Sequence, residues 1–350
     1  MSRKFPSLAV LLGLALLAVI VSSAQVSPQQ AKGRLVGDPF AATYRVIRRF
    51  PLGGAGGWDY LAVDSHARRA YIARSDRVMV VDADSGKLIS EIGGLERAHG
   101  VALATELNRG FISSGGQGKV VAFHLGALKP IAEIAAGINP DAIVYDPRWK
   151  RVWAFNGGSN SASVLDATSL VPVRTIALPG KPEFAVLDPH GQIYVNLVDK
   201  SAIARIDAHT MAITAEWPLA PCQSPTGLAI DVAKGRLFAG CGNAVMAILD
   251  IATGKLLATV AIGKHCDGVA FDPASGVVVS ANGEGTLTIV RETRRGKFAA
   301  VQTVATRPGA RTVAFDEAAH SFLLPVGEGR NQTGGGSFEL LVVGSAEGGK

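Results

Sequence analysis

The sequence predicts an all-β fold, a seven-bladed β-propeller with four antiparallel strands in each blade. The first observation is a segment that occurs seven times: an apolar run that closes on an Asp, a short turn, and a second apolar run. The second is the spacing, because the closing position recurs at steps of 40 to 44 residues. A period near 42 in an all-strand pattern is typical of propeller blades. The closing positions are Asp64, Ala104, Asp146, Asp188, Asp231, Asp272 and Asp316.

The first period shows how a blade divides into strands. We expect these at Tyr60–Val63, Ala70–Ala73, Val78–Val81 and Leu88–Ile92. An Asp begins the turn between the third and fourth strands, as in Asp82-Ala-Asp-Ser-Gly-Lys87. Its carboxylate can accept hydrogen bonds from backbone amides two residues further on, so we interpret the turn aspartates as structural. The alternation of turns and β-branched runs leaves no room for a helix of any length.

The seventh period holds only three expected strands, at Thr312–Phe315, Phe322–Leu324 and Phe338–Val343. The segment that begins at Tyr44 is similar to the fourth strands of other periods. We therefore expect it to complete the last blade beside residues 338–343, so that the propeller spans residues 43–344. This pairing would close the ring and cover an otherwise exposed strand edge.

The N-terminus has the form of a secretory signal. Arg3 and Lys4 precede the apolar stretch Leu8–Val21, and the small residues of Ser22-Ser23-Ala24 follow. We expect a signal peptide over residues 1–24, cleaved after Ala24, and a periplasmic or secreted protein. An uncleaved N-terminal anchor is the alternative, and after cleavage we expect no membrane insertion. Residues 25–42 and 345–350 are expected to form tails.

Composition limits the class of partner. The net charge of +6 falls to +4 without Arg3 and Lys4, and the remaining basic residues are scattered. A nucleic-acid surface ordinarily carries a denser basic stripe, so the charge gives little support to nucleic-acid binding. We expect a monomer whose partner is an unknown protein or small molecule.

Seven polar residues occupy equivalent places, each five positions before a closing position. By repeat symmetry they should form a ring at one mouth of the central channel, where they could bind a ligand. The ring consists of Asp59, His99, Asp141, Glu183, Thr226, Asp267 and Arg311. The alternative is that polar residues at a water-filled mouth have no function beyond capping free amides.

The ring also offers metal ligands. Four carboxylates, those of Asp59, Asp141, Glu183 and Asp267, could hold a divalent ion, and oxygen ligands favour Ca²⁺ or Mg²⁺. His99 would admit a transition metal.

The loops between the second and third strands should open on the same face as the ring. They supply secondary candidates for ligand binding: Arg74, Asn156, Asn196, Asn282 and Glu284.

Three cysteines follow the signal segment. Cys222 and Cys241 fall in two loops of the fifth period, and an oxidising compartment favours a disulfide between them. Cys266 is then left as a packed free thiol.

The repeats resemble the YVTN family of seven-bladed propellers, and over the mature chain they are similar to its bacterial YncE-like members. The resemblance lies in five segments: Gly57–Asp64, Asn139–Pro147, Lys181–Asp188, Trp217–Cys222 and Asn282–Thr288. It implies an exported or periplasmic propeller, usually without an assigned reaction. YncE-like proteins have been associated with single-stranded DNA, but this chain shows no aromatic and basic stripe that would carry that association over.

The sequence favours a binding or interaction module that works through the polar ring. The other hypothesis is an enzyme, a metal-dependent lactonase or lyase with a cation in the channel, by analogy with other propellers. No HExxH, GxSxG or P-loop motif is present, and no residue is assigned a catalytic role.

Overall fold

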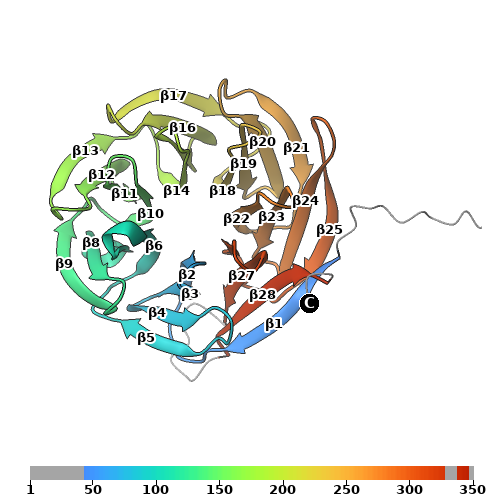
Figure 1. Ribbon diagram of the computed structural model, residues 1–350. Helices are drawn as coiled ribbons and strands as arrows, with labels where there is room; N and C mark the ends of the chain where they lie inside the picture. The colour runs from blue at the N-terminus through green and yellow to red at the C-terminus, as the bar shows by residue number, and fades with distance from the viewer. Residues whose placement is uncertain (1–42, 328–336, 347–350) are drawn as a thin grey trace, which may run out of the picture. The chain divides into compact units, whose positions relative to one another are not determined.

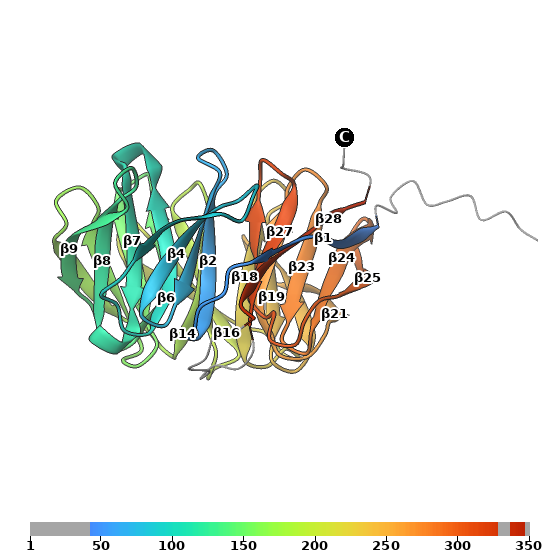
Figure 2. The same ribbon diagram turned by 90° about the horizontal axis from the view of Figure 1, so that it is seen from below.

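The computed structural model describes residues 43–327 and 337–346. The predicted signal peptide, the tail over residues 25–42 and the end of the C-terminal tail lie outside these residues. Seven sheets, each of four antiparallel strands, stand around a central axis (Figure 1). The predicted seven-bladed β-propeller is confirmed. In the side view the innermost strands run along the axis of the ring (Figure 2).

The first four blades follow one another along the chain. They are β2 (Trp58–Asp64), β3 (Arg69–Arg74), β4 (Arg77–Asp82) and β5 (Leu88–Ile92); β6 (Ala98–Ala104), β7 (Arg109–Ser114), β8 (Lys119–His124) and β9 (Lys129–Ala135); β10 (Pro140–Asp146), β11 (Arg151–Asn156), β12 (Ser161–Asp166) and β13 (Pro172–Ala177); and β14 (Pro182–Leu187), β15 (Gln192–Leu197), β16 (Ala202–Asp207) and β17 (Ala212–Pro218).

The last three blades include the one that joins the chain's two ends. They are β18 (Pro225–Asp231), β19 (Arg236–Cys241), β20 (Val245–Asp250) and β21 (Leu256–Ala261); β22 (Cys266–Asp272), β23 (Val277–Asn282), β24 (Thr286–Arg294) and β25 (Lys297–Ala305); and β26 (Ala314–Asp316), β27 (Ser321–Val326), β28 (Glu339–Ser345) and β1 (Tyr44–Pro51).

Strand β1 pairs with β28 from Tyr44 opposite Ser345 to Pro51 opposite Glu339. The expected closure by the N-terminal strand is therefore confirmed, and the blue and red strands lie side by side in Figure 1. The innermost strand of this blade is shorter than expected, because β26 pairs only over Ala314–Asp316.

The hydrophobic core lies between neighbouring blades. One cluster combines Tyr71 of β3 with Ile112 of β7 and Phe123 of β8, all fully buried. A single four-stranded sheet cannot bury both of its faces, so each blade depends on the next for its core. This dependence explains why the ring must close.

In several blades an arginine at the start of the second strand bonds to the next blade along the chain. Arg69 donates to the backbone oxygen of Leu125 at 2.9 Å, and Arg151 donates to that of Ala208 at 2.7 Å. Arg109 makes the same contact with Ala167. In blade five Arg236 instead forms a two-pronged ion pair with Glu292, at 2.7 and 2.8 Å. The arginine five residues after a closing position thus serves blade packing.

The outermost strand of every blade carries an irregularity in its pairing. In each of these pairings one residue of the outermost strand has no partner on the neighbouring strand, and that residue is exposed to solvent. A bulge of this kind twists an edge strand and makes it a poor template for pairing with another chain. The skipped residues are Ile47, Ile89, Ile131, Val173, Thr214, Leu257 and Val301.

Helical structure in the described residues is limited to two single 3₁₀ turns, η1 (Thr105–Leu107) and η2 (Gly115–Gln117). No helix among those residues has the length and apolar character to span a membrane. The turn aspartates act as expected: Asp82, for example, accepts a hydrogen bond from the amide of Ser85 at 2.8 Å.

The structure pairs Cys222 with Cys241 in a disulfide whose Cα atoms lie 5.7 Å apart. Both side chains are fully buried in the core of blade five. Cys266 is a buried free thiol.

Candidate functional site

Each ring residue in blades one to six lies where the innermost strand loses register with its neighbour. The pairing of β2 with β3 shifts between Trp58 and Leu61, for example, and Asp59 lies within that interval. The corresponding shifts in β6, β10, β14, β18 and β22 enclose the other five residues. A bulge changes the direction of a side chain, and bulges are common beside functional sites. In each of these six strands the ring residue occupies the second position.

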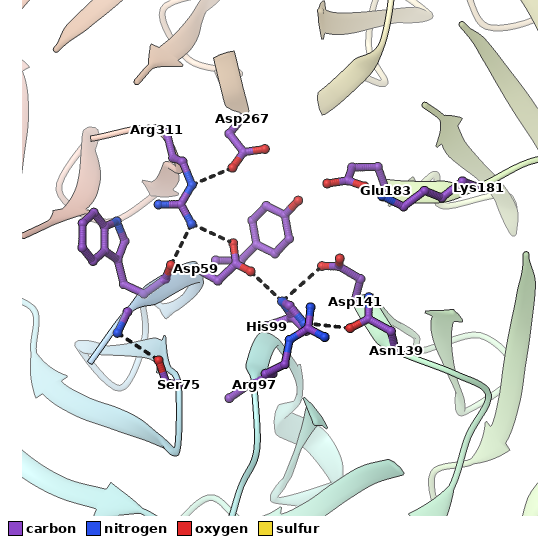
Figure 3. Close-up of a pocket in the computed structure, with 14 residues that line it drawn as sticks. Asp59, Ser75, Arg97, His99, Asn139, Asp141, Lys181, Glu183, Asp267 and Arg311 are labelled. Atoms are coloured by element: carbon purple, nitrogen blue, oxygen red, sulfur yellow. Dashed lines mark hydrogen bonds and ion pairs between the residues drawn. The ribbon is translucent and has the colours of Figure 1, made fainter. Parts of the chain in front are cut away.

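Six of the seven ring residues line one cavity of about 360 Å³ at a mouth of the channel (Figure 3). These are Asp59, His99, Asp141, Glu183, Asp267 and Arg311. Thr226 does not line it, because its hydroxyl donates to the backbone oxygen of Cys266 at 2.6 Å. In blade five the ring position is therefore used to join two blades.

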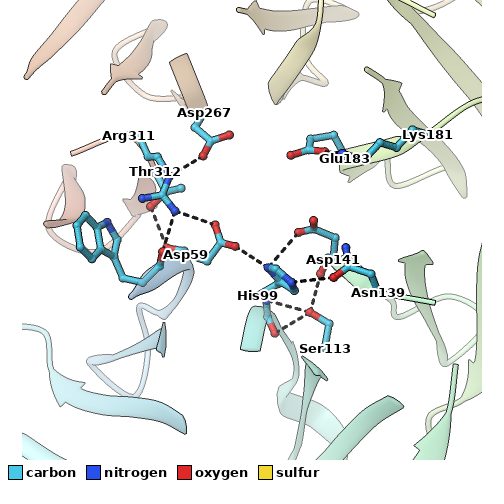
Figure 4. Close-up of polar contacts among 12 residues, drawn as sticks. Asp59, His99, Ser113, Asn139, Asp141, Lys181, Glu183, Asp267, Arg311 and Thr312 are labelled. Carbon is cyan, nitrogen blue, oxygen red and sulfur yellow. Dashed lines mark hydrogen bonds and ion pairs between the residues drawn. The ribbon is translucent and has the colours of Figure 1, made fainter. Parts of the chain in front are cut away.

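A chain of alternating charges runs around one side of the cavity (Figure 4). Arg311 donates through Nε to Asp267 Oδ2 at 2.8 Å, and its Nη2 lies 3.6 Å from Asp59 Oδ1. The other oxygen of Asp59 lies 2.6 Å from His99 Nδ1. That nitrogen is also 3.7 Å from Asp141 Oδ1. Three carboxylates and two cationic or ionisable groups thus alternate across five blades.

On the opposite side of the cavity the carboxyl groups have fewer hydrogen-bond donors and cations beside them. Among the described residues no hydrogen bond reaches the carboxyl group of Asp141 or Glu183, and the Lys181 ammonium lies 3.7 Å from Glu183. Burial raises the pKa of Glu183 to about 8, and the charges of Asp141 and Asp267 act in the same direction. Burial also raises the pKa of Asp141 to about 6, although His99 opposes the shift.

His99 responds to the same surroundings in the opposite sense. Burial lowers the pKa of the imidazole, but the hydrogen bond to Asp59 and the charge of Asp141 outweigh that effect, so the net shift is upward. Without another cation, the imidazolium form of His99 balances the two carboxylates beside it.

An aromatic pair crosses the channel beside the cavity. Tyr60 lines the cavity, and its ring meets that of Phe184 edge-on with centroids 4.9 Å apart. The two rings come from blades one and four, which are not neighbours, so the contact crosses the channel. Burial raises the pKa of Tyr60 well above its usual value, and the surrounding carboxylates add to this shift. The Tyr60 hydroxyl is therefore neutral at physiological pH.

The polar residues of the cavity wall that sequence reasoning missed include Ser75, Arg97, Asn139 and Lys181. The last three each stand two positions before a ring residue, so the register that located the ring could have found them. Arg97 and Asn139 have left-handed backbone conformations, with φ of 53° and 52°. That conformation turns the chain just before the innermost strand begins.

The secondary candidates do not line the cavity. Four are fully buried and support loops: Asn156 Oδ1 accepts from the amide of Gly137, for example, at 3.1 Å. Arg74 donates to the backbone oxygens of Ala55 and Gly57, each at 2.9 Å. The structure thus gives these side chains framework roles, because buried polar groups need internal partners. The residues concerned are Arg74, Asn156, Asn196 and Asn282, while Glu284 accepts from Thr286 at the surface.

The expected metal ligands are only partly brought together. Asp59, His99 and Asp141 offer ligand atoms that all lie within 4.8 Å of one another. The expected set had Glu183 and Asp267 in place of His99. Asp267 instead pairs with Arg311. The predicted metal ligands were all carboxylate oxygens, whereas the ligand atoms that converge in the structure include an imidazole nitrogen.

Comparisons with known proteins support the fold. No protein-family model matches the chain, and no curated protein matches it in sequence. Among solved structures, a chain of Kuenenia stuttgartiensis hydrazine synthase is 15% identical with a TM-score of 0.69, covering 77% of this chain and 92% of that one. The structure of U3-55K is 10% identical with a TM-score of 0.73, covering 86% and 98%.

The WD40 repeats of RRP9 are also similar, at 9% identity and a TM-score of 0.73, with coverage of 86% and 97%. At such low identities the likeness extends to the β-propeller architecture alone. A shared fold does not imply a shared function, so what this chain does depends on its own site.

Proposed function

We propose that this protein is an exported, YncE-like propeller that binds a small polar ligand in the cavity at its channel mouth. Export is supported by the signal-like N-terminus, and the family by the five segments that resemble it. The binding role rests on one observation. Side chains from six blades converge on one cavity in which the carboxyl groups of Asp141 and Glu183 lack hydrogen bonds from the described residues.

Both carboxyl groups line the cavity, so their oxygens can accept hydrogen bonds from a ligand bound there. The cavity has the size expected of a small-molecule site. The Tyr60–Phe184 pair lies across the channel beside it, and Tyr60 offers the ligand an aromatic surface. Arg97 and Lys181 stand nearer to solvent than the carboxyls and would contact the outer part of the ligand.

Native mass spectrometry of protein purified from its source tests this proposal. We expect a small molecule to be retained by the wild type and lost from the Asp141→Asn/Glu183→Gln double variant. Glu216→Gln removes a carboxylate on the exposed part of β17 and should retain it. A macromolecular partner that binds the double variant as well as the wild type would contradict the cavity as the working site.

A metal-dependent lactonase or lyase is the second candidate function. The specific observation in its favour is the convergence of Asp59, His99 and Asp141. Turnover of a panel of five- and six-membered lactones, abolished by chelation and restored by added metal, would support it. Equal rates for the wild type and His99→Ala would exclude it.

A further inference from the structure

We propose that Asp59, His99 and Asp141 bind a divalent transition-metal ion, with Zn²⁺ preferred to Ca²⁺ and Mg²⁺. The inference deepens the proposed function, on which it rests, by placing an ion in the same cavity. The facing atoms are Asp59 Oδ2 and Asp141 Oδ1, at 2.6 and 3.7 Å from His99 Nδ1. Ligand atoms bound tetrahedrally at about 2.1 Å lie about 3.4 Å apart, within that range.

The residues around these three atoms have the arrangement that supports metal ligands. His99 Nε2 lies 3.3 Å from Asn139 Oδ1, so it can donate its proton there and leave Nδ1 free to bind an ion. Asp59 uses Oδ1 toward Arg311, and Arg311 is fixed by Asp267 at 2.8 Å. Metal-bound histidines and carboxylates are usually oriented by polar contacts of this kind to their remaining atoms.

Two buried groups aimed at the cavity lack a hydrogen-bond partner. Asp141 is only 9% exposed, and no hydrogen bond reaches its carboxyl group from the described residues. Tyr60 is 7% exposed, and its hydroxyl likewise has no hydrogen bond in the described part of the chain. A cation bound by Asp141, carrying a water molecule near Tyr60, would satisfy both groups.

The donor set decides the class of metal. Calcium requires six to eight oxygen ligands, and magnesium an octahedron of oxygens. Here Asp267 is paired with Arg311, and one of the three converging atoms is an imidazole nitrogen. Imidazole favours Zn²⁺ and its neighbours in the first transition row. Three protein ligands would leave a coordination position for water or for the ligand, as in catalytic zinc sites.

Binding of the metal alone tests the inference. Untagged protein is stripped with a chelator and titrated with ZnCl₂ in competition with a chromophoric chelator, and then with CaCl₂ and MgCl₂. We expect one Zn²⁺ per chain and no saturable binding of Ca²⁺ or Mg²⁺. His99→Ala and Asp141→Asn should each lower the Zn²⁺ affinity at least about 100-fold. His190→Ala removes an exposed surface histidine and should leave it unchanged.

Asn139 is a positioning residue, and its variant must respect the backbone. Asn139→Gly tolerates the left-handed φ of 52° and removes the acceptor. It should weaken Zn²⁺ binding about 10- to 100-fold. Asn139→Asp keeps an acceptor and should restore the affinity, which a purely structural role would not predict. Circular dichroism of every variant establishes that it is folded.

The inference is overturned if folded wild-type protein binds no Zn²⁺, or if the His99→Ala and Asp141→Asn variants bind it equally well. It is overturned equally if Ca²⁺ binds more tightly than Zn²⁺. A small molecule that stays bound to chelator-treated protein would leave the proposed binding function standing without the metal. Loss of small-molecule retention and of Zn²⁺ binding together would refute both.

Discussion

Arg311 donates a hydrogen bond through Nε to Asp267 Oδ2 at 2.8 Å, although the two residues are separated by 44 positions and lie in different blades. The same guanidinium donates to the backbone oxygen of Trp58 at 2.7 Å, in a third blade. The side chain of Arg311 is 12% exposed and that of Asp267 20%. One arginine thus joins the last blade to both of its neighbours at the mouth of the channel.

Replacing this arginine should destabilise the propeller. Arg311→Ala would remove the guanidinium that contacts the partly buried carboxyls of Asp59 and Asp267, at a cost of about 2 kcal/mol in the free energy of unfolding. Urea denaturation followed by tryptophan fluorescence measures the change. Arg295→Ala, at an exposed position, is the control and should alter stability by less than about 0.5 kcal/mol. Equal midpoints for the two variants would show that Arg311 contributes little.

Glu183 should give the stability a distinctive dependence on pH. The folded state raises the pKa of Glu183 from 4.5 to about 8, so the folded chain binds this proton more tightly than the unfolded chain. The resulting stabilisation is complete below the unfolded pKa and is lost as the pH rises through the folded value. The unfolding free energy of the wild type, relative to that of Glu183→Gln, should therefore decrease as the pH rises from 4.5 to 8. A difference that is constant over this range would contradict the raised pKa.

Arg74 should matter for folding and not for ligand binding. Its guanidinium is fully buried, holds the loop backbone at Ala55 and Gly57, and lies 3.6 Å from the centre of the Phe338 ring. Arg74→Lys cannot reproduce this planar set of hydrogen bonds and should lower the stability by about 2 kcal/mol. Ligand retention by the folded variant should match the wild type. If the Arg74→Lys variant lost the ligand while its stability stayed unchanged, Arg74 would have to be counted among the binding residues.

The disulfide should account for a large share of the stability. It closes a loop across a sequence separation of 19 residues in the core of blade five. The Cys222→Ala/Cys241→Ala variant is expected to lose about 3 kcal/mol, measured by urea denaturation. Under native conditions a thiol reagent should label neither protein, because Cys266 is buried. Rapid labelling of the native wild type would contradict this arrangement.

Deleting residues 43–51 tests closure of the ring. Without β1, β28 would lose the strand paired with it from Glu339 to Ser345 and expose its edge. We expect loss of cooperative unfolding and concentration-dependent aggregation, measured by light scattering. The control is the triple variant Arg45→Ala/Arg48→Ala/Arg49→Ala, which keeps the backbone pairing of β1 with β28 and should remain soluble and cooperative.

The repeat determined much of the site as well as the fold. It predicted the seven blades, the closing strand, and the equivalent positions of Asp59, His99, Asp141 and Glu183, because equivalent positions in a closed ring meet at its axis. It could not separate Thr226 from the others, since whether a side chain enters the cavity or bonds to the next blade depends on which oxygen lies within reach. It also assigned Arg74 and Asn156 to the binding face, although both are buried.

The sequence by itself determined the architecture, since a 42-residue period of apolar runs and turns has to bury each sheet against the next copy. Only the tertiary structure decided the electrostatics of the cavity. Arg311 neutralises Asp267 and also lies near Asp59, whereas Asp141 and Glu183 lie where donors do not reach them. These relationships depend on distances of a few ångströms between residues more than 40 positions apart, and Coulomb energies and hydrogen bonds change steeply over such distances.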